Sequence, residues 1–236
     1  ILDGLELDIL IPDYNLAIEY HGGYWHSFDR TERSYERMRH SNKCDAALKK
    51  GIHLLQIFDA EWEQQQDLIK SMIRNRLGLS KRIYARRCSI VNIDKKDYYT
   101  FCDQNHLSGR KPCDVCYGLE YDNQIVSVIS FTNKGDFFEL ERFCSRIGHV
   151  VVGGLSKLLK AANIQKLMTY ADRRYSDARG YINAGFNIYC ITKPGYYYWR
   201  NGQIFNRRSF QKHRLSRKLA TFDPNLTESE NMFNNG

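Results

Sequence analysis

The chain has no run of about 18 apolar residues, the length that marks a membrane-spanning helix, and no secretory signal pattern precedes Asp8. We therefore expect a cytoplasmic protein that does not enter a membrane. A disordered chain is excluded as well, because 42% of the residues are hydrophobic and 13% are aromatic. The 236 residues are long enough for two domains.

A disulfide framework is also missing. The seven cysteines are odd in number and have no regular spacing, which indicates reduced thiols. Cys113 and Cys116 have the spacing of zinc ligands, but no second pair matches them. Two buried thiols are the favoured interpretation, with a zinc site as the alternative.

Acidic residues are absent from residues 190–221, although eight Lys and Arg lie there. Residues 1–78 carry 10 basic and 13 acidic residues, so residues 79–236 carry the remaining 25 and 14, a net charge of +11. Basic groups interleaved with the aromatic residues 196–199 favour binding to a phosphate backbone. A solvated surface over a buried aromatic strand is the alternative. The predicted contacts to double-stranded DNA in this stretch are Arg200, Arg207, Arg208 and Lys212.

Two short strands are predicted near the start, at residues 5–11 and 16–21, joined by a proline turn and followed by two glycines. Side chains alternate along a strand, so Glu19 and His21 share a face on which Asp8 can converge. Carboxylates suit Mg²⁺, and an imidazole transfers protons at neutral pH. Two carboxylates and an imidazole grouped in this way predict metal-assisted phosphodiester hydrolysis. Taken singly, each residue is an ordinary solvated or hydrogen-bonded polar group.

The segment from Asp8 to His26 resembles the core of the very-short-patch repair (Vsr) endonucleases. It contains an aspartate, a proline turn, an apolar strand and then His-Gly-x-aromatic-Trp-His. The resemblance implies that Asp8 binds magnesium and that His21 and His26 handle protons. It also implies that Tyr24 and Trp25 belong to an aromatic wedge that enters the DNA stack.

Two positions depart from that family. Tyr20 replaces its threonine, and Glu19 replaces an apolar residue. The Asp…Glu-x-His arrangement is similar to the general nuclease motif Asp…(Asp/Glu)-x-Lys, with His21 at the lysine position. We therefore expect Glu19 to be a further metal ligand with a catalytic role. The resemblance extends to phage homing endonucleases, which implies action in the cytoplasm of an infected bacterial cell.

The next segments support this placement. Residues 33–50 contain no proline or glycine and predict a helix, followed by a strand at 52–58 and a helix at 59–77. Strand, strand, helix, strand is the order of the nuclease core. His40 and Lys43 share one helix face. We expect His40 to orient a catalytic water or a phosphate and Lys43 to contact DNA, with a solvated basic face as the alternative. Such cores usually begin with a helix that carries an acidic residue, and we expect this helix to precede residue 1.

Beyond residue 79 the predicted order is a strand (83–93), a helix (96–105), a hairpin turning at 121–124, a strand (136–144), a helix (154–162), a strand (167–170), a helix (175–184) and a strand (186–192). This order resembles the GNAT acetyltransferase fold, with Gly153-Gly154 where that family binds pyrophosphate. Val151 stands where the family favours Gln or Arg. No small-molecule coenzyme is therefore expected.

The same half resembles a domain appended to phage nuclease domains and, more distantly, the phage DNA-modification protein Mom. The shared motifs contain Arg86 and Arg87, and also Arg173 and Arg174 in a turn after a strand, where α/β sheets bind ligands. These four arginines are predicted DNA contacts. A salt bridge from Asp172 that caps the next helix is the alternative for the turn.

These observations predict an α/β protein with a restriction-endonuclease-like (Vsr-like) domain at 1–78, a GNAT-like DNA-binding domain at 79–222 and a flexible tail at 223–236. The expected function is that of a Mg²⁺-dependent DNA endonuclease of the phage homing type. An acyl-coenzyme A-dependent, Mom-type enzyme that modifies DNA bases and a mismatch-directed nicking enzyme are the alternatives.

Overall fold

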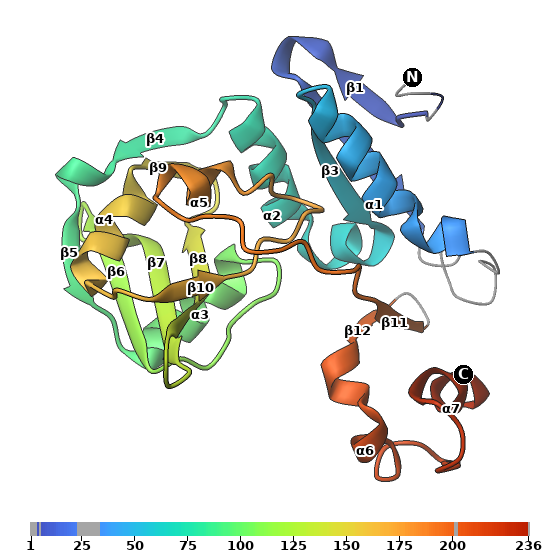
Figure 1. Cartoon of the computed structure of the whole chain (residues 1–236). Coiled ribbons are helices and arrows are strands. Elements are labelled where there is room, and N and C mark those ends of the chain that lie inside the picture. Colours follow the sequence, from blue (N-terminus) through green and yellow to red (C-terminus); the bar gives the residue numbers. More distant parts are fainter. Residues whose placement is uncertain (1–3, 5, 23–33, 201–202, 236) are drawn as a thin grey trace.

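The amino-terminal part is a three-stranded sheet with one helix on each face (Figure 1). The computed structural model describes residues 4, 6–22, 34–200 and 203–235. Strand β1 (Ile9–Ile11) pairs antiparallel with β2 (Leu16–His21), and β2 pairs in parallel with β3 (His53–Phe58). Helix α1 (Ser34–Lys49) connects β2 to β3, and α2 (Asp59–Arg76) follows β3. The predicted order of strand, strand, helix, strand is confirmed, although the first strand begins only at Ile9.

Both faces of β2 are buried because the sheet lies between these helices. Ala17 and Leu54 pack against Cys44 and Ala47 of α1. On the opposite face, residues of β2 and β3 pack against Ile69 of α2. A strand covered on both sides is apolar at nearly every position. A polar residue inside β2 or β3 is therefore conspicuous.

The second part is built on a five-stranded sheet in the order β10-β8-β7-β6-β5. Strands β5 (Ser89–Asn92), β6 (Val115–Tyr121), β7 (Gln124–Asn133) and β8 (Phe138–Ser145) run antiparallel, and β10 (Leu167–Thr169) joins β8 in parallel. Strands β4 (Lys81–Tyr84) and β9 (His149–Val152) form a separate parallel pair. The helices of this part are α3 (Lys95–Asn105), α4 (Gly154–Ala162) and α5 (Arg179–Asn183). The described chain is thus a mixed α/β protein.

Three sequence predictions for this part need correction. The strand expected at 83–93 is divided into β4 and β5 by a 3-10 turn at Ala85–Arg87. Helix α5 is shorter than the predicted 175–184. Residues 186–192 form no strand, and Tyr189 in this segment is 92% exposed. Their apolar pattern suited a strand, but a strand also needs a neighbouring edge with which to pair.

The carboxyl-terminal part extends away from both sheets (Figure 1). Strands β11 (Tyr197–Arg200) and β12 (Gln203–Asn206) form a hairpin, followed by α6 (Lys212–Leu215) and α7 (Glu228–Asn234). Helix α7 falls within the segment expected to be a flexible tail. It forms because Thr227 and Glu230 make a reciprocal capping box, a strong local signal for a helix start.

The first two parts are packed together. The backbone N–H of Gln56 in β3 donates to the carbonyl of Arg174 at 2.9 Å, so the turn at residues 172–177 lies along the outer edge of β3. His53 Nε2 also lies 3.1 Å from the carbonyl oxygen of Tyr175. Elsewhere, Gly148 N donates to Ser71 Oγ at 2.8 Å.

In the described part of the chain, no helix combines the length and apolar character needed to cross a membrane.

Candidate active site

Asp8 and Glu19 lie opposite each other at the open end of the β1–β2 hairpin. They continue the register that pairs Ile9 with Ile18. The backbone N–H of Asp8 donates to Glu19 Oε1 at 3.3 Å, and the N–H of Tyr20 donates to Asp8 Oδ2 at 2.8 Å. Asp8 is exposed, whereas Glu19 is only 3% exposed. The two residues predicted as metal ligands are thus adjacent, and their role stays a prediction.

The carboxylate of Glu19 is neutralised from inside the protein. Lys43 of α1 donates from Nζ to Glu19 Oε2 at 2.5 Å, and both side chains are 5% exposed. A buried carboxylate needs such a partner, because removing a charge from water without one is very costly. We expected Lys43 to contact DNA from the helix surface. The structure instead directs its ammonium group inward.

His21 and His40 lie against each other behind this pair. Their ring centroids are 4.1 Å apart with the planes at 70°, and the ring of Phe58 lies 5.2 Å from that of His21. His21 is 4% exposed. The expectation that a histidine of α1 reaches the hairpin is therefore met. The predicted site residues Tyr24, Trp25 and His26 lie outside the described residues.

Sequence reasoning missed Gln56, which connects these groups. It is the amide in the apolar strand β3 and is 1% exposed. Its Oε1 lies 3.2 Å from His21 Nε2, and its Nε2 donates to the carbonyl of His40 at 3.0 Å. The same Nε2 contacts the thiol of Cys44, whose pKa is raised by burial. A lone amide in a fully buried strand was the signal that could have identified it.

Arg173 and Arg174 hold the 172–177 turn against the first part. Arg174 donates to both Asp172 and Glu61, the latter at 2.9 Å, and its guanidinium lies over the ring of Phe58. Arg173 pairs with Asp45 of α1. This arrangement favours the salt-bridge alternative for the turn, while the DNA contacts stay a prediction.

The glycine turn before α4 is explained by internal packing. A Cβ on Gly154 would lie 3.1 Å from Val151 Cγ1, and Gly153 has φ +77°, which glycine adopts without strain. Lys157 donates from Nζ to the carbonyl oxygens of Ala85 at 2.9 Å and Cys88 at 2.5 Å. Its ammonium group therefore caps the 3-10 turn.

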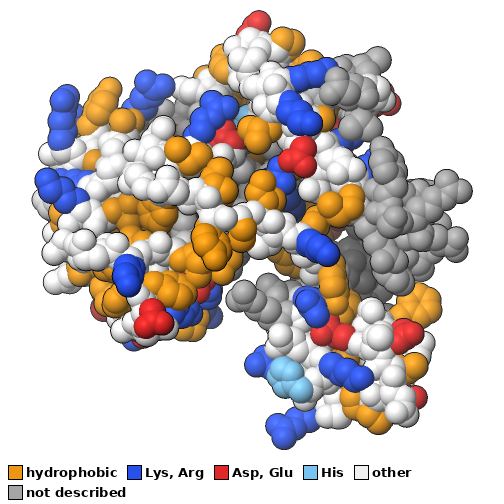
Figure 2. All heavy atoms as spheres, viewed as in Figure 1, with side chains coloured by type: hydrophobic (Ala, Val, Ile, Leu, Met, Phe, Trp, Pro, Cys, Tyr) orange, Lys and Arg blue, Asp and Glu red, His pale blue; other side chains and the backbone are white. Residues whose placement is uncertain are grey.

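The predicted DNA contacts of the second and third parts differ in availability. Arg86 and Arg87 are exposed and lie over the rings of Tyr84 and Tyr121. Arg207 Nε donates to Glu228 Oε1 at 2.9 Å, so a carboxylate of α7 already neutralises it. Lys212 is exposed, and the side chains of Arg200 and Arg208 lie outside the described set. Figure 2 shows Lys and Arg side chains on the carboxyl-terminal part as well as on the body that contains the five-stranded sheet.

Cys113 and Cys116 resemble core residues more than zinc ligands. Burial raises the pKa of Cys113 to about 12 and also raises the pKa of Cys116. Cys102 and Cys144 pack in the same apolar cluster. Within the described ranges, no group of three or more His, Cys, Asp or Glu side chains is placed to hold a metal ion.

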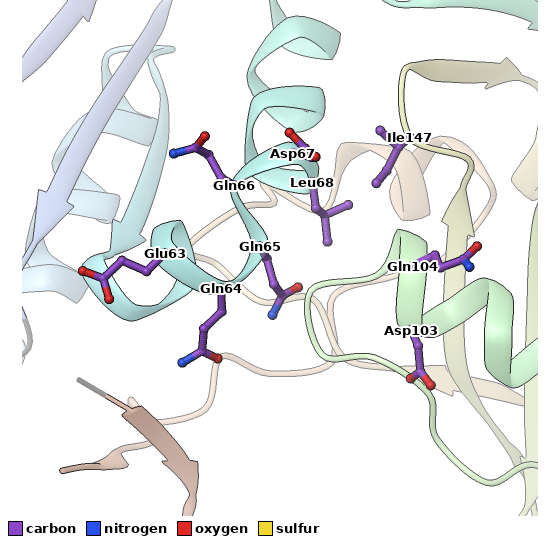
Figure 3. A pocket seen from close by; sticks show the side chains of 9 residues that line it. All are labelled: Glu63, Gln64, Gln65, Gln66, Asp67, Leu68, Asp103, Gln104 and Ile147. Carbon is purple, nitrogen blue, oxygen red and sulfur yellow. The ribbon is translucent and has the colours of Figure 1, made fainter. Parts of the chain in front are cut away.

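A cavity of about 370 Å³ lies between α2 and α3 (Figure 3). It opens where α2 bends at Gln65, whose φ and ψ of −137° and 37° are not helical. Asp103 and Gln104 of α3 line its other side, together with Ile147. None of the predicted site residues lines it. We therefore place the candidate chemistry at the hairpin rather than in this cavity.

Comparison of the chain with protein-family models, with curated proteins and with solved structures found no match.

Proposed function

We propose that the protein is a Mg²⁺-dependent DNA endonuclease of the homing type that hydrolyses a phosphodiester bond at a specific site. The observation that supports this most is the grouping of two carboxylates with buried basic side chains. Exposed Asp8 adjoins Glu19, and Glu19 adjoins Lys43. His21 lies two residues along the same strand face. Two carboxylates, an ammonium group and an imidazole thus lie at one end of the three-stranded sheet.

These residues fit Mg²⁺ better than a metal that needs a closed cage. Magnesium keeps several waters and is usually held by one or two carboxylates together with phosphate oxygens of the substrate. Asp8 would hold the ion, with Glu19 as the second carboxylate. When bound, Mg²⁺ polarises the phosphate and lowers the pKa of a coordinated water.

The remaining groups have separate tasks in this proposal. Lys43 keeps the carboxylate of Glu19 fixed and charge-balanced at 2.5 Å. His21 takes or gives a proton at the reacting oxygen, and His40 supports its ring through their contact. His26, Tyr24 and Trp25 keep the roles that the resemblance implies for them.

The basic surface supplies affinity for double-stranded DNA. The chain has a net charge of +8, in which +11 from residues 79–236 is partly offset by −3 from residues 1–78. Contacts between Lys or Arg and phosphates are strong and insensitive to sequence. The acidic cleavage site would hold the metal while the basic parts hold the DNA.

The coenzyme-dependent alternative is less well supported. In that reading Gly153, Gly154 and Lys157 would bind a pyrophosphate. In the structure the two glycines are explained by packing and backbone conformation, and Lys157 caps the 3-10 turn.

A plasmid cleavage assay tests the proposal. Cleavage should require Mg²⁺, stop with EDTA and be unaffected by acetyl-coenzyme A. Asp8→Ala should abolish cleavage and leave DNA affinity nearly unchanged, since loss of a metal-ligand carboxylate costs several kcal/mol of transition-state stabilisation. Asp13→Ala, in the exposed turn between β1 and β2, is the matched control and should cleave normally. Full activity of the Asp8 variant would refute the assignment.

A further inference from the structure

Gln56 occupies a position that no surface or packing role requires. It is an amide at 1% exposure in a strand buried on both faces, where a Leu or Val would fill the space without polar atoms. Burying an amide is unfavourable unless each of its polar atoms is hydrogen-bonded. The side-chain amide of Gln56 meets this condition with partners on β2 and α1, and its backbone N–H donates to the 172–177 turn.

The orientation of its amide is determined by one of these partners. The carbonyl oxygen of His40 can only accept a hydrogen bond, so the atom that faces it must be the NH₂ group of Gln56. The other amide atom, Oε1, then faces His21 Nε2 at 3.2 Å. Because an amide oxygen can only accept, the ring nitrogen facing it must carry a hydrogen.

We infer that Gln56 is a positioning residue that holds neutral His21 in the tautomer with its proton on Nε2. In this tautomer the ring lone pair is on Nδ1, the nitrogen that does not face Gln56. A fixed second partner on the far ring nitrogen commonly sets which nitrogen of a histidine reacts. The catalytic consequence rests on the proposed function, whereas the tautomer does not.

The same residue connects the site to the second part of the protein. Its backbone N–H donates to the carbonyl of Arg174, and Cys44 beside it donates from Sγ to the carbonyl of Arg173 at 3.5 Å. The 172–177 turn thus fixes the main chain of Gln56 while the side chain fixes His21. A substitution that destabilises the 172–177 turn should therefore alter the position of His21, although the change is made through Gln56.

The tautomer can be measured directly by long-range ¹H–¹⁵N correlation spectra of the full-length protein labelled at histidine. In the wild type, His21 should show a protonated Nε2 and an unprotonated Nδ1. The Gln56→Met variant keeps the volume but removes the acceptor, and should show a mixture of the two tautomers. Gln56→Glu retains an oxygen acceptor and should retain the Nε2–H form. The control Gln66→Met, on the exposed side of α2, should match the wild type.

Plasmid cleavage separates this inference from the proposed function. Gln56→Met should lower kcat by roughly tenfold or more with little change in KM, because DNA contacts are intact. A wild-type His21 protonated on Nδ1 would overturn the inference even in an active enzyme. If Gln56→Met does not fold, the wild-type spectrum and the Gln56→Glu variant still decide. The expected tautomer in a protein that cleaves no DNA would support the role of Gln56 and refute the proposed function.

Discussion

Lys43 and Glu19 form a buried ion pair, and burying either charge without its partner would destabilise the fold. Lys43→Met should leave an uncompensated carboxylate at 3% exposure and destabilise the fold by about 3–5 kcal/mol. The double variant Lys43→Met/Glu19→Gln removes both charges and should recover part of this loss. Urea unfolding gives the free energy of unfolding of the wild type, the single variant and the double variant. Lys70→Met, at an exposed lysine that donates to Gln66, is the matched control and should change stability little. Equal stabilities for Lys43→Met and wild type would contradict the buried pair.

His106 should make stability depend on pH. Burial, aided by Arg142, lowers the pKa of His106 from 6.5 to about 4. Its Nδ1 accepts from the backbone N–H of Ser108 at 3.1 Å, which suits the neutral ring. Because the folded pKa is below the unfolded value, the unfolded chain binds the proton more readily. This stabilisation is present above pH 6.5 and is lost as the pH falls towards about 4.

His106→Asn keeps an acceptor near the position of Nδ1 but does not titrate. Unfolding measured at both ends of that pH window should therefore show a flatter pH dependence for the variant than for wild type. An unchanged slope would mean that another group causes the loss of stability in acid.

At the level of elements, Gly154 tests whether the glycine turn before α4 serves packing. Gly154→Ala would bring a methyl group to 3.1 Å from Val151 and should destabilise the protein by roughly 1–3 kcal/mol. Gly180→Ala is a matched control near the start of α5, where a Cβ meets nothing within 4 Å. Thermal unfolding should show a clear loss for the first variant and none for the second. Similar behaviour of the two would remove the packing explanation.

The sequence predicted the elements that have strong local signals. Helix α4 has the predicted bounds, 154–162, because it begins at a glycine turn and its apolar residues recur with helical spacing. The Asp8–Glu19 pairing was also predictable, because a short hairpin determines its own register. The absence of a strand at 186–192 was not predictable, since strand formation depends on a partner edge distant in sequence. Gln56 and the inward direction of Lys43 depend on how α1 packs across the sheet, which no local pattern specifies.

At the level of the whole molecule, DNA affinity should depend on the exposed cations around α6. Changing Lys212, Arg217 and Lys218 together to Gln should weaken binding to duplex DNA and lower the slope of log affinity against log salt by about 0.9 per lost phosphate contact. The matched control replaces three exposed lysines of the second part, Lys95, Lys96 and Lys160. Binding titrations at several salt concentrations compare the two sets. A slope for the α6 variant equal to that of the wild type would show that the carboxyl-terminal part does not hold DNA.

Because the 172–177 turn covers the edge of β3, the amino-terminal sheet cannot be completed until this turn has been synthesised. His53 and Tyr175, which meet at this edge, are 122 residues apart in sequence. Contacts between distant residues form late, and until then an uncovered strand edge is open to pairing with other chains. On the ribosome, β3 therefore emerges long before the turn that covers its outer edge. A half-synthesised chain would carry the β1–β2 hairpin without the turn that holds the main chain of Gln56, so the candidate site would be complete only after the part built on the five-stranded sheet has been made.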